Sequence, residues 1–237
     1  MNVYVFDKSF NMLGVVDDYT SLIWSREYYN IGTVEMHSKV NEHTLSILQK
    51  GNILVKENNL TEAMYIDSIY MDYQHYETMI VKGFSIDNFL DDRCVWGTQT
   101  YIGTIEDVMR SFVDINCISV PGRANRKILN LYLGVKSNIQ TQASEVNSWS
   151  KVSELMKELA LKYDVGWRIV FDRENRKYVF EVYRGKDRSL SQDVNPHAIF
   201  ANEYENIFNQ SYTDSDTNLK TTAIIAGTGD DPNRVVV

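Results

Sequence analysis

Residues 33–40 alternate strictly between two kinds of side chain. One side of the alternation carries Val34, Met36, Ser38 and Val40, and the other carries Thr33, Glu35, His37 and Lys39. A period of two is typical of a β-strand with one buried and one solvated face. Gly32 separates this run from the aromatic stretch at 24–29, and a glycine inside a strand usually marks a bulge or bend. The pattern predicts one long, kinked strand over residues 22–40, which could serve two sheets and pair with the strands before and after it.

Other short strands, separated by turns, surround this one in the N-terminal part of the chain. They are expected at 3–6, 12–16, 53–56, 63–72 and 78–82. A short helix is expected between Asn41, a good N-cap, and Gly51, a C-terminal stop, and another at 86–90. These elements are enough to curl one sheet into a small barrel or sandwich.

Helical periodicity replaces strand alternation after residue 97. Thr104 and Asp107 have the spacing of a capping box, with Asp in place of Glu, and an apolar stripe follows them. Ser150 is expected to cap a second helix with a similar stripe. Strands are expected at 128–133, 165–171 and 178–183, the last two as a hairpin. The middle segment is therefore expected to be α+β.

Strand-like stretches return after the polar run at 186–196. They lie at 198–200, 207–212 and 219–226 and resemble the N-terminal strands in style. We expect them to rejoin the N-terminal unit, so that residues 1–98 plus 199–237 form one discontinuous domain and residues 99–198 an inserted one. The chain ends on an apolar run at 235–237, and we expect it to be a truncated fragment.

The composition favours a strand-rich fold and disfavours two kinds of partner, DNA and anionic membranes. The 237 residues are 43% hydrophobic and 24% charged, and Tyr 15 and Phe 9 against Pro 3 favour a strand-rich chain. A net charge of -8 opposes tight binding to DNA or to an anionic membrane. Cys94 and Cys117 are expected to be free thiols, because no signal peptide precedes them. No apolar run approaches the ~20 residues of a membrane span.

Candidate catalytic groups are few. The four histidines, His37, His43, His75 and His197, lack metal-ligand spacing. The pairs at 17–18, 91–92 and 230–231 are adjacent aspartates, and neighbours in sequence diverge on strands and helices, so solvated turns explain them better than glycosidase chemistry. The Gly-Thr-Gly at 227–229 is too short for a phosphate cradle.

Two further groups of residues could contact a partner. Arg123, Arg126 and Lys127 make a basic loop that could meet phosphate, although three charges are usually a solvated loop. Tyrosines at 28, 29, 65, 70, 73 and 76 could stack on sugars or proteins, although strand packing explains most of them. Trp24 and Trp96 are also assigned to packing. We therefore assign no catalytic, cofactor-binding or metal-binding residue and expect no cofactor.

Several short motifs, taken in order, resemble a known family. They lie at 17–24 (DDYTSLIW), 32–36 (GTVEM), 50–52 (KGN), 93–97 (RCVWG), 125–128 (NRKI), 183–189 (YRGKDRS), 206–208 (NIF) and 226–229 (AGTG). Together they resemble the siphophage tail proteins related to the baseplate hub and to the N-terminal region of tail-associated lysins. The resemblance spans nearly the whole chain.

The resemblance implies a fold and a structural role. The fold would be α+β but mainly β, a tube-protein-like β-barrel interrupted by an inserted α+β domain, and the family's second barrel would be missing here. The protein would cap the tail tube of a phage or prophage and link it to the receptor-binding and cell-wall-penetrating apparatus. It would act in the virion tail after synthesis in the host cytoplasm, as a structural protein rather than an enzyme.

The implied partners are other virion proteins. The full-length protein would form a homotrimeric ring and contact the distal tail protein, the tape measure and the receptor-binding protein, whereas the fragment could be monomeric. DNA would be met only in transit, and no stable membrane association is expected. Two alternatives stay open: a phage entry enzyme that cuts peptidoglycan or capsule, and a carbohydrate- or receptor-binding module.

Overall fold

The chain divides into two compact units, Met1–Lys186 and Asp187–Val237. We describe them from a computed structural model, which describes residues 1–71, 77–207, 212–216, 219, 221–222 and 227–228. Within these residues, no helix is both long enough and apolar enough to cross a membrane.

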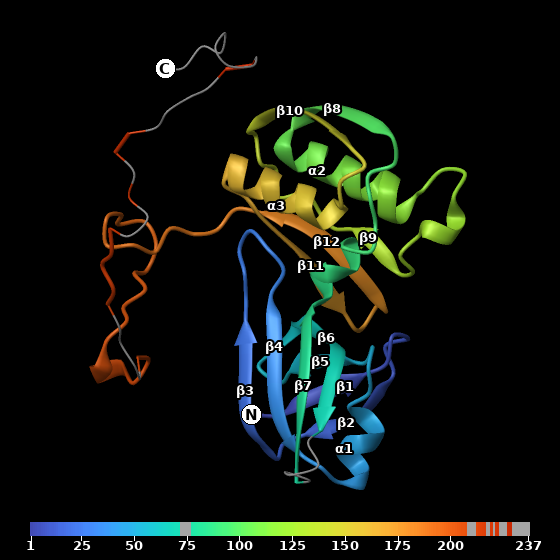
Figure 1. Ribbon diagram of the computed structural model, residues 1–237, viewed down its shortest axis with the longest axis vertical. Coiled ribbons are helices and arrows are strands. Elements are labelled where there is room, and N and C mark those ends of the chain that lie inside the picture. Colours follow the sequence, from blue (N-terminus) through green and yellow to red (C-terminus); the bar gives the residue numbers. More distant parts are fainter. Residues whose placement is uncertain (72–76, 208–211, 217–218, 220, 223–226, 229–237) are drawn as a thin grey trace. The chain divides into compact units, whose positions relative to one another are not determined.

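The N-terminal half of the first unit is a seven-stranded antiparallel sheet (Figure 1). Its strands are β1 (Val3–Phe6), β2 (Met12–Val16), β3 (Tyr19–Ser25), β4 (Thr33–Lys39), β5 (Ile53–Lys56), β6 (Asn59–Met71) and β7 (Thr78–Ser85), in the spatial order β2-β1-β5-β6-β7-β4-β3. The helix α1 (Glu42–Ile47) begins at the expected cap, where the Asn41 side chain accepts the Thr44 N–H and the Thr44 hydroxyl accepts the Asn41 N–H. The short 3₁₀ helix η1 (Ile86–Leu90) follows β7.

This sheet must be strongly curled. Its two edge strands, β2 and β3, are joined by only Asp17 and Asp18, a link that spans at most about 11 Å. A flat sheet of this order would separate its edges by roughly 29 Å. The Tyr19 hydroxyl of edge strand β3 donates over 2.8 Å to the carbonyl oxygen of Met1, which precedes β1, the neighbour of the opposite edge strand β2. Within the described residues no backbone ladder joins β2 to β3, so the sheet approaches a barrel without closing into one.

The prediction of one long kinked strand over residues 22–40 is wrong. Residues 19–39 form two strands, β3 and β4, which pair with each other as a hairpin in a single sheet. Gly32 lies directly before β4 rather than at a kink within a strand, and a Cβ there would come within 2.4 Å of the Ser25 carbonyl oxygen. The close approach of the two hairpin arms therefore requires glycine. The alternation itself is confirmed, since Val34, Met36 and Ser38 are buried.

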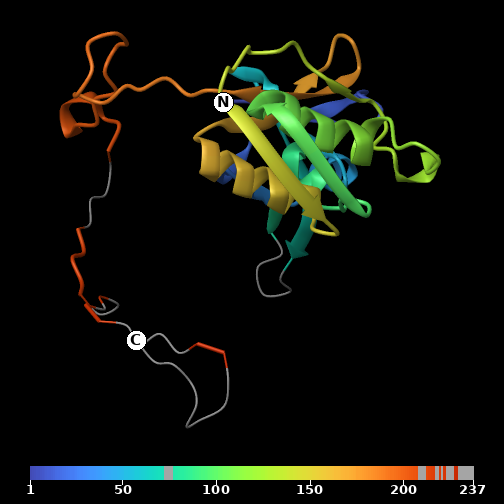
Figure 2. The same cartoon turned by 90° about the horizontal axis from the view of Figure 1, so that it is seen from above.

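The rest of the first unit is α+β, as expected. Its elements are β8 (Thr98–Thr104), α2 (Ile105–Val113), the π-helical turn η2 (Asp114–Ile118), η3 (Ala124–Arg126), β9 (Leu131–Leu133), β10 (Gln142–Ser148), α3 (Val152–Tyr163), β11 (Gly166–Asp172) and β12 (Lys177–Tyr183). β11, β12 and β9 form one sheet, in which β9 is parallel to β12. β8 and β10 form a separate two-stranded ribbon, seen from above over α2 and α3 in Figure 2.

Several local expectations about this part need correction. The β8–β10 ribbon was not expected, because its strands carry few apolar residues. The strand expected at 128–133 is limited to Leu131–Leu133. Thr104 caps α2, with its Oγ1 accepting the Asp107 N–H, but Ser150 does not cap α3. The Ser150 hydroxyl instead donates to Asn147 Oδ1 over 2.5 Å.

Two hydrophobic clusters hold the first unit together. The interior of the curled sheet contains Val3, Val5, Val34, Met36, Leu54, Met64 and Ile66, each at most 3% exposed. The second cluster joins the outer side of this sheet, through Phe6, Ile53 and Val55, to α2, α3 and the β11–β12 hairpin. Because the second cluster spans both halves, they form one compact unit.

The second unit contains little regular structure where it is described. Residues 198–200, expected as a strand, are irregular, and the 3₁₀ helix η4 (Asn202–Tyr204) follows them. The strands expected at 207–212 and 219–226 lie mostly outside the described residues. The mainly β, α+β class is confirmed. The discontinuous domain division at residues 98 and 198 stays a prediction.

Candidate functional site

A polar cavity of about 50 Å³ lies inside the first unit, where the β3–β4 connection, β6, η1 and β11 meet. We call it the Glu62 cavity. Its lining includes Arg26, Glu62, Ser85, Asp87, Trp167 and Arg168. The long strand β6 brings Glu62 here, and the start of η1 brings Asp87.

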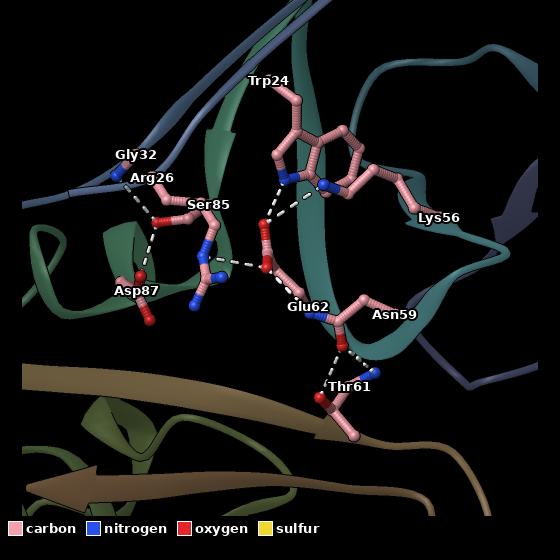
Figure 3. Close-up of polar contacts among 9 residues, drawn as sticks. All are labelled: Trp24, Arg26, Gly32, Lys56, Asn59, Thr61, Glu62, Ser85 and Asp87. Carbon is pink, nitrogen blue, oxygen red and sulfur yellow. Dashed lines mark hydrogen bonds and ion pairs between the residues drawn. The ribbon is translucent and has the colours of Figure 1, made fainter. Parts of the chain in front are cut away.

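Glu62 is the centre of a charged network (Figure 3). Its side chain is 15% exposed and receives hydrogen bonds from the Trp24 indole N–H and from Asn59 Nδ2, the latter over 3.0 Å. Arg26 Nε lies 3.0 Å from Glu62 Oε2, and Lys56 Nζ lies 3.8 Å from Oε1. Cations and donors from three strands or their ends thus converge on one carboxylate, which offsets the cost of its desolvation.

Ser85 and Asp87 form the second part of the cavity. The Gly32 N–H donates to Ser85 Oγ over 3.1 Å, and the Ser85 hydroxyl donates in turn to Asp87 Oδ2 over 2.6 Å. Asp87 Oδ1 accepts the backbone N–H of Ile169 in β11. Burial raises the pKa of Asp87 to about 6, against the opposing effects of these hydrogen bonds and of the Arg168 charge. Asp87 therefore fastens the curled sheet to β11.

The volume of the Glu62 cavity limits the chemistry that its carboxyl groups can perform. A carboxyl group with a pKa near 6 beside a second carboxylate is a pattern that acid–base catalysis also uses. A cavity of about 50 Å³, however, holds only a few water molecules, whereas small-molecule sites occupy roughly 300–1,000 Å³. The geometry is that of a buried polar joint between two sheets.

The histidines do not converge on a site. His37 Nε2 lies 2.8 Å from Glu35 Oε1, and His43 Nε2 lies 3.0 Å from the Val15 carbonyl oxygen. His197 belongs to the second unit, and His75 lies outside the described residues. In the described part of the chain, no three His, Cys, Asp or Glu side chains are grouped to hold a metal.

The adjacent aspartates are surface and cap residues where they are described. Asp18 pairs with Lys39 over 2.7 Å. Asp91 pairs with Lys151 over 2.8 Å and accepts the Ser153 hydroxyl over 2.6 Å. The pair at 230–231 and the end of the Gly-Thr-Gly motif lie outside the described residues.

The two cysteines are free, as expected. Cys117 is fully buried, and burial raises the pKa of its thiol to about 12, so it is a packing residue. The carbonyl oxygen of Cys94 accepts a hydrogen bond from Arg126 Nη2 over 2.7 Å. Arg126 and Arg123 both lie over the Trp96 ring, at 5.1 and 4.0 Å from its centroid.

Trp96, which we assign to packing, makes its packing contacts at the surface. It is 42% exposed and meets the 61% exposed Trp149 edge to face. Trp24, by contrast, packs against the interior of the curled sheet.

Tyr28 and Tyr29 join the β3–β4 connection to the α+β half. The Tyr28 hydroxyl accepts the Gly185 N–H over 2.7 Å, and the Tyr29 hydroxyl donates to Asp164 over 2.7 Å. Tyr65 packs against Phe84 and Phe89, and Tyr70 is exposed. Tyr73 and Tyr76 lie outside the described residues. The described tyrosines therefore do not gather on one binding face.

Sequence reasoning missed Glu62 and Asp87. Each stands alone in its stretch, and the contacts that matter join residues far apart, as from Asp87 to Ile169. The Ser-x-Asp spacing at 85–87, directly before a short helix, is the local signal that could have drawn attention to Asp87. That the chain has no catalytic residue stays a prediction.

A family model described as siphovirus ReqiPepy6 Gp37-like protein matches residues 2–237. The chain belongs to this family. The resemblance to siphophage tail proteins is confirmed at this level, although no curated protein matches the Gp37-like chain.

Solved structures are similar to this Gp37-like protein in fold. The prophage tail protein gp18 from Listeria monocytogenes EGD-e is 14% identical, with a TM-score of 0.51 over 76% of this chain and 50% of that one. The prophage MuSo2 43 kDa tail protein from Shewanella oneidensis is 11% identical, with a TM-score of 0.47 over 80% of this chain and 55% of that one. The Gp37-like chain thus spans about half the length of these structures. The likeness to gp18 shows that the two share a fold.

Proposed function

We propose that this Gp37-like protein is a structural component of a phage or prophage tail tip, a baseplate hub-like protein. It caps the tail tube and links it to the receptor-binding and cell-wall-penetrating apparatus. The observation that carries the proposal is the family match over residues 2–237, and the fold shared with a prophage tail protein supports it. The role is mechanical, so the surfaces of the protein matter more than any internal site.

The edges of the curled sheet support a role in assembly. Met12 and Leu13 on β2 are 47% and 40% exposed, and Ile23 on β3 is 55% exposed. Exposed apolar residues on edge strands are sites where a second chain can add contacts. We propose that the full-length protein forms a trimeric ring through such surfaces and contacts the distal tail protein, the tape measure and the receptor-binding protein. The net charge of -8 suits a ring that DNA crosses in transit.

We also propose that the protein is not an enzyme. The Glu62 cavity is too small for a sugar or peptide substrate, and its carboxylates are already held by Arg26, Lys56 and the Ile169 N–H. An arrangement of two carboxylates facing across an open cleft would be needed to hydrolyse a glycoside.

Localisation in the virion tests the structural role. Particles of the phage that encodes this chain are labelled with gold on an affinity tag fused to the protein and viewed by electron microscopy. Gold is expected at the distal end of the tail. Gold on the capsid, along the tube or absent from purified particles would refute the tail-tip role. Light scattering of the purified full-length protein tests the ring, and a mass other than that of a trimer would refute it.

A separate assay tests whether the protein is an enzyme. Purified cell walls are incubated with the protein, and soluble peptidoglycan fragments are measured against a lysozyme control. We expect no release above the buffer level. Release that disappears in a Glu62→Gln variant would make the Glu62 cavity an active site and would overturn the non-enzymatic proposal.

A further inference from the structure

A groove of about 400 Å³ lies on the surface of the first unit, formed by four separate stretches of chain. We call it the Lys127 groove. Its lining includes Lys8, Phe89, Arg93, Lys127, Leu129 and Tyr178. It shares no lining residue with the Glu62 cavity and has about eight times its volume. A volume of this size lies in the range of small-molecule sites, so a side chain of a partner could enter it.

The groove is positively charged in an acidic chain. Lys8, Arg93 and Lys127 line it, against a single carboxylate, that of Asp92, whereas the whole chain has a net charge of -8. In the part of the chain that the structure describes, none of these three cations forms an ion pair with a carboxylate. The charge of the groove is therefore free to act on a partner.

The backbone holds one of these cations in place. Arg93 donates to three backbone carbonyl oxygens: from Nε to that of Arg126 over 2.5 Å, from Nη1 to that of Asp92 over 2.9 Å and from Nη2 to that of Lys127 over 3.5 Å. Three of its five N–H groups are thus used, which leaves two for an incoming group. A guanidinium fixed in this way loses little conformational entropy when it binds an anion.

The lining of the groove also contains apolar side chains. Phe89 and Ile128 are partly buried there, and Leu129 is 80% exposed. Tyr178 also lines the groove; it is 4% exposed, and its ring packs against Phe10 and Phe89. Charge and apolar surface within one groove match a ligand that carries both, and a bare phosphate carries only charge.

We propose that the Lys127 groove is a docking site for an acidic segment of another polypeptide. Carboxylates of the segment pair with Lys127 and Arg93, and an apolar side chain of the segment covers Leu129. Positive charge continues next to the groove through Arg126 and Arg123 over Trp96, which lengthens the surface available to an extended acidic chain. Nucleic acid is disfavoured as the occupant because the rest of the chain repels it.

Peptide pools test the proposal. The probe is a pool of fluorescein-labelled twelve-residue peptides in which Asp or Glu alternates with Leu, Ile or Phe. The matched pool carries Lys or Arg in place of the acids. Fluorescence polarisation is expected to show binding of the acidic pool only, with an affinity that falls as NaCl is raised. Absence of binding by the acidic pool, or equal binding of the two pools, would overturn the proposal.

Variants locate the binding in the groove. Lys127→Glu is expected to weaken binding of the acidic pool about tenfold or more, and Leu129→Ser about threefold. The controls, Lys157→Glu and Leu161→Ser, make the same changes at exposed positions of α3 and are expected to leave binding unchanged. Equal effects in variants and controls would show that the peptides bind elsewhere, and the proposal would fail.

Two competitors distinguish the kind of ligand. Inorganic phosphate and a single-stranded oligonucleotide are added to the complex of the protein with the acidic pool. Neither is expected to displace the peptides at physiological ionic strength. Displacement by the oligonucleotide alone would assign the groove to nucleic acid, and displacement by phosphate alone to a simple anion site; either result would overturn the proposal. The result does not depend on whether the protein caps a tail tube.

Discussion

The Glu62 cavity and the Lys127 groove use the same kinds of residue in opposite ways. In the cavity, Glu62 has two cations and two uncharged donors as partners, and Asp87 has two donors. In the groove, the charges of Lys8, Arg93 and Lys127 have no carboxylate partner among the described residues, and the hydroxyl of Tyr178 has no hydrogen-bond partner. The first region has completed its interactions within the chain, and the second has not.

The contrast separates groups that hold the fold from groups that can meet a partner. A buried charge whose partners are all present stabilises one arrangement of the strands, and removing it leaves those partners unpaired. An exposed charge without a partner contributes little to stability and can be replaced cheaply. Substitutions of the paired charges in the cavity should therefore change the free energy of unfolding, whereas substitution of an exposed, unpaired charge of the groove, such as Lys127, should change binding.

Removal of Glu62 should have the largest effect. Glu62→Ala leaves the Trp24 N–H, Arg26 and Lys56 without their acceptor, and we expect a loss of about 3–4 kcal/mol in the free energy of unfolding. Urea titration followed by tryptophan fluorescence measures it. Glu158→Ala, at an exposed position of α3, is the control and should change stability by less than about 0.5 kcal/mol. Equal losses in the two variants would remove the distinction between the regions.

The effect of Asp87 depends on pH. Its pKa is about 6 in the folded protein and near 3.8 in the unfolded chain, so the folded state binds more protons between these values. The contribution of Asp87 to stability is then fully present below about pH 4 and is lost as pH rises through 6, by about 2–3 kcal/mol. Asp87→Asn, which stays neutral, should match the wild type near pH 4 and exceed it near pH 7.

Only the difference between these two proteins is informative, because several other carboxyls, such as Asp107 and Glu145, have lowered pKa values and give the opposite slope below about pH 4. Urea unfolding at each pH measures the difference. A constant difference from pH 4 to pH 7 would show that Asp87 does not titrate in this window.

Tyr178 should show a smaller effect of the opposite sign. Tyr178→Phe removes a buried hydroxyl that has no partner, and we expect a gain of about 1 kcal/mol. Tyr163→Phe is the matched change, and it should lose about 1 kcal/mol because the Tyr163 hydroxyl donates to Glu145. Thermal unfolding of both variants gives the two signs directly. A loss of stability in Tyr178→Phe would mean that its hydroxyl is satisfied.

Charge reversal in the groove should have the smallest effect on stability. Lys127→Glu should change the free energy of unfolding by less than about 0.5 kcal/mol, because the exposed ammonium group has no partner to lose. Lys151→Ala, which removes a lysine paired with Asp91, should cost up to about 1 kcal/mol. A larger loss for Lys127→Glu than for Lys151→Ala in the same urea titration would show that the groove is part of the folded framework.

Elements encoded by neighbouring residues could be predicted from the sequence. The alternation in β4, the cap of α2 by Thr104 and the β11–β12 hairpin agree with their patterns. In each, the signal and the structure lie within a few residues of each other. The β8–β10 ribbon could not be predicted in this way, because Ala143 is the only buried residue of β10, which therefore carries almost no apolar alternation.

The pairing of strands with one another could not be predicted from local sequence patterns. The alternation at 22–40 fits a single kinked strand and a hairpin equally well. Only the pairing of β4 with β3 on one side and β7 on the other selects the hairpin. The curl of the sheet likewise follows from its strand order, in which two strands joined by two residues stand at opposite edges. The candidate site depends on contacts such as that of Asp87 with Ile169.

The sequence by itself determined the mainly β, α+β class, the helix starts that have a side-chain cap, the excess of negative charge and the family resemblance. The tertiary structure alone decided which charges are paired and which are left exposed. Hydrophobic periodicity is read within a few neighbouring residues, because burial on one face repeats with the geometry of the strand or helix. The pairing of Glu62 with Arg26, or the lack of a partner for Lys127, depends instead on which distant segments the core brings together.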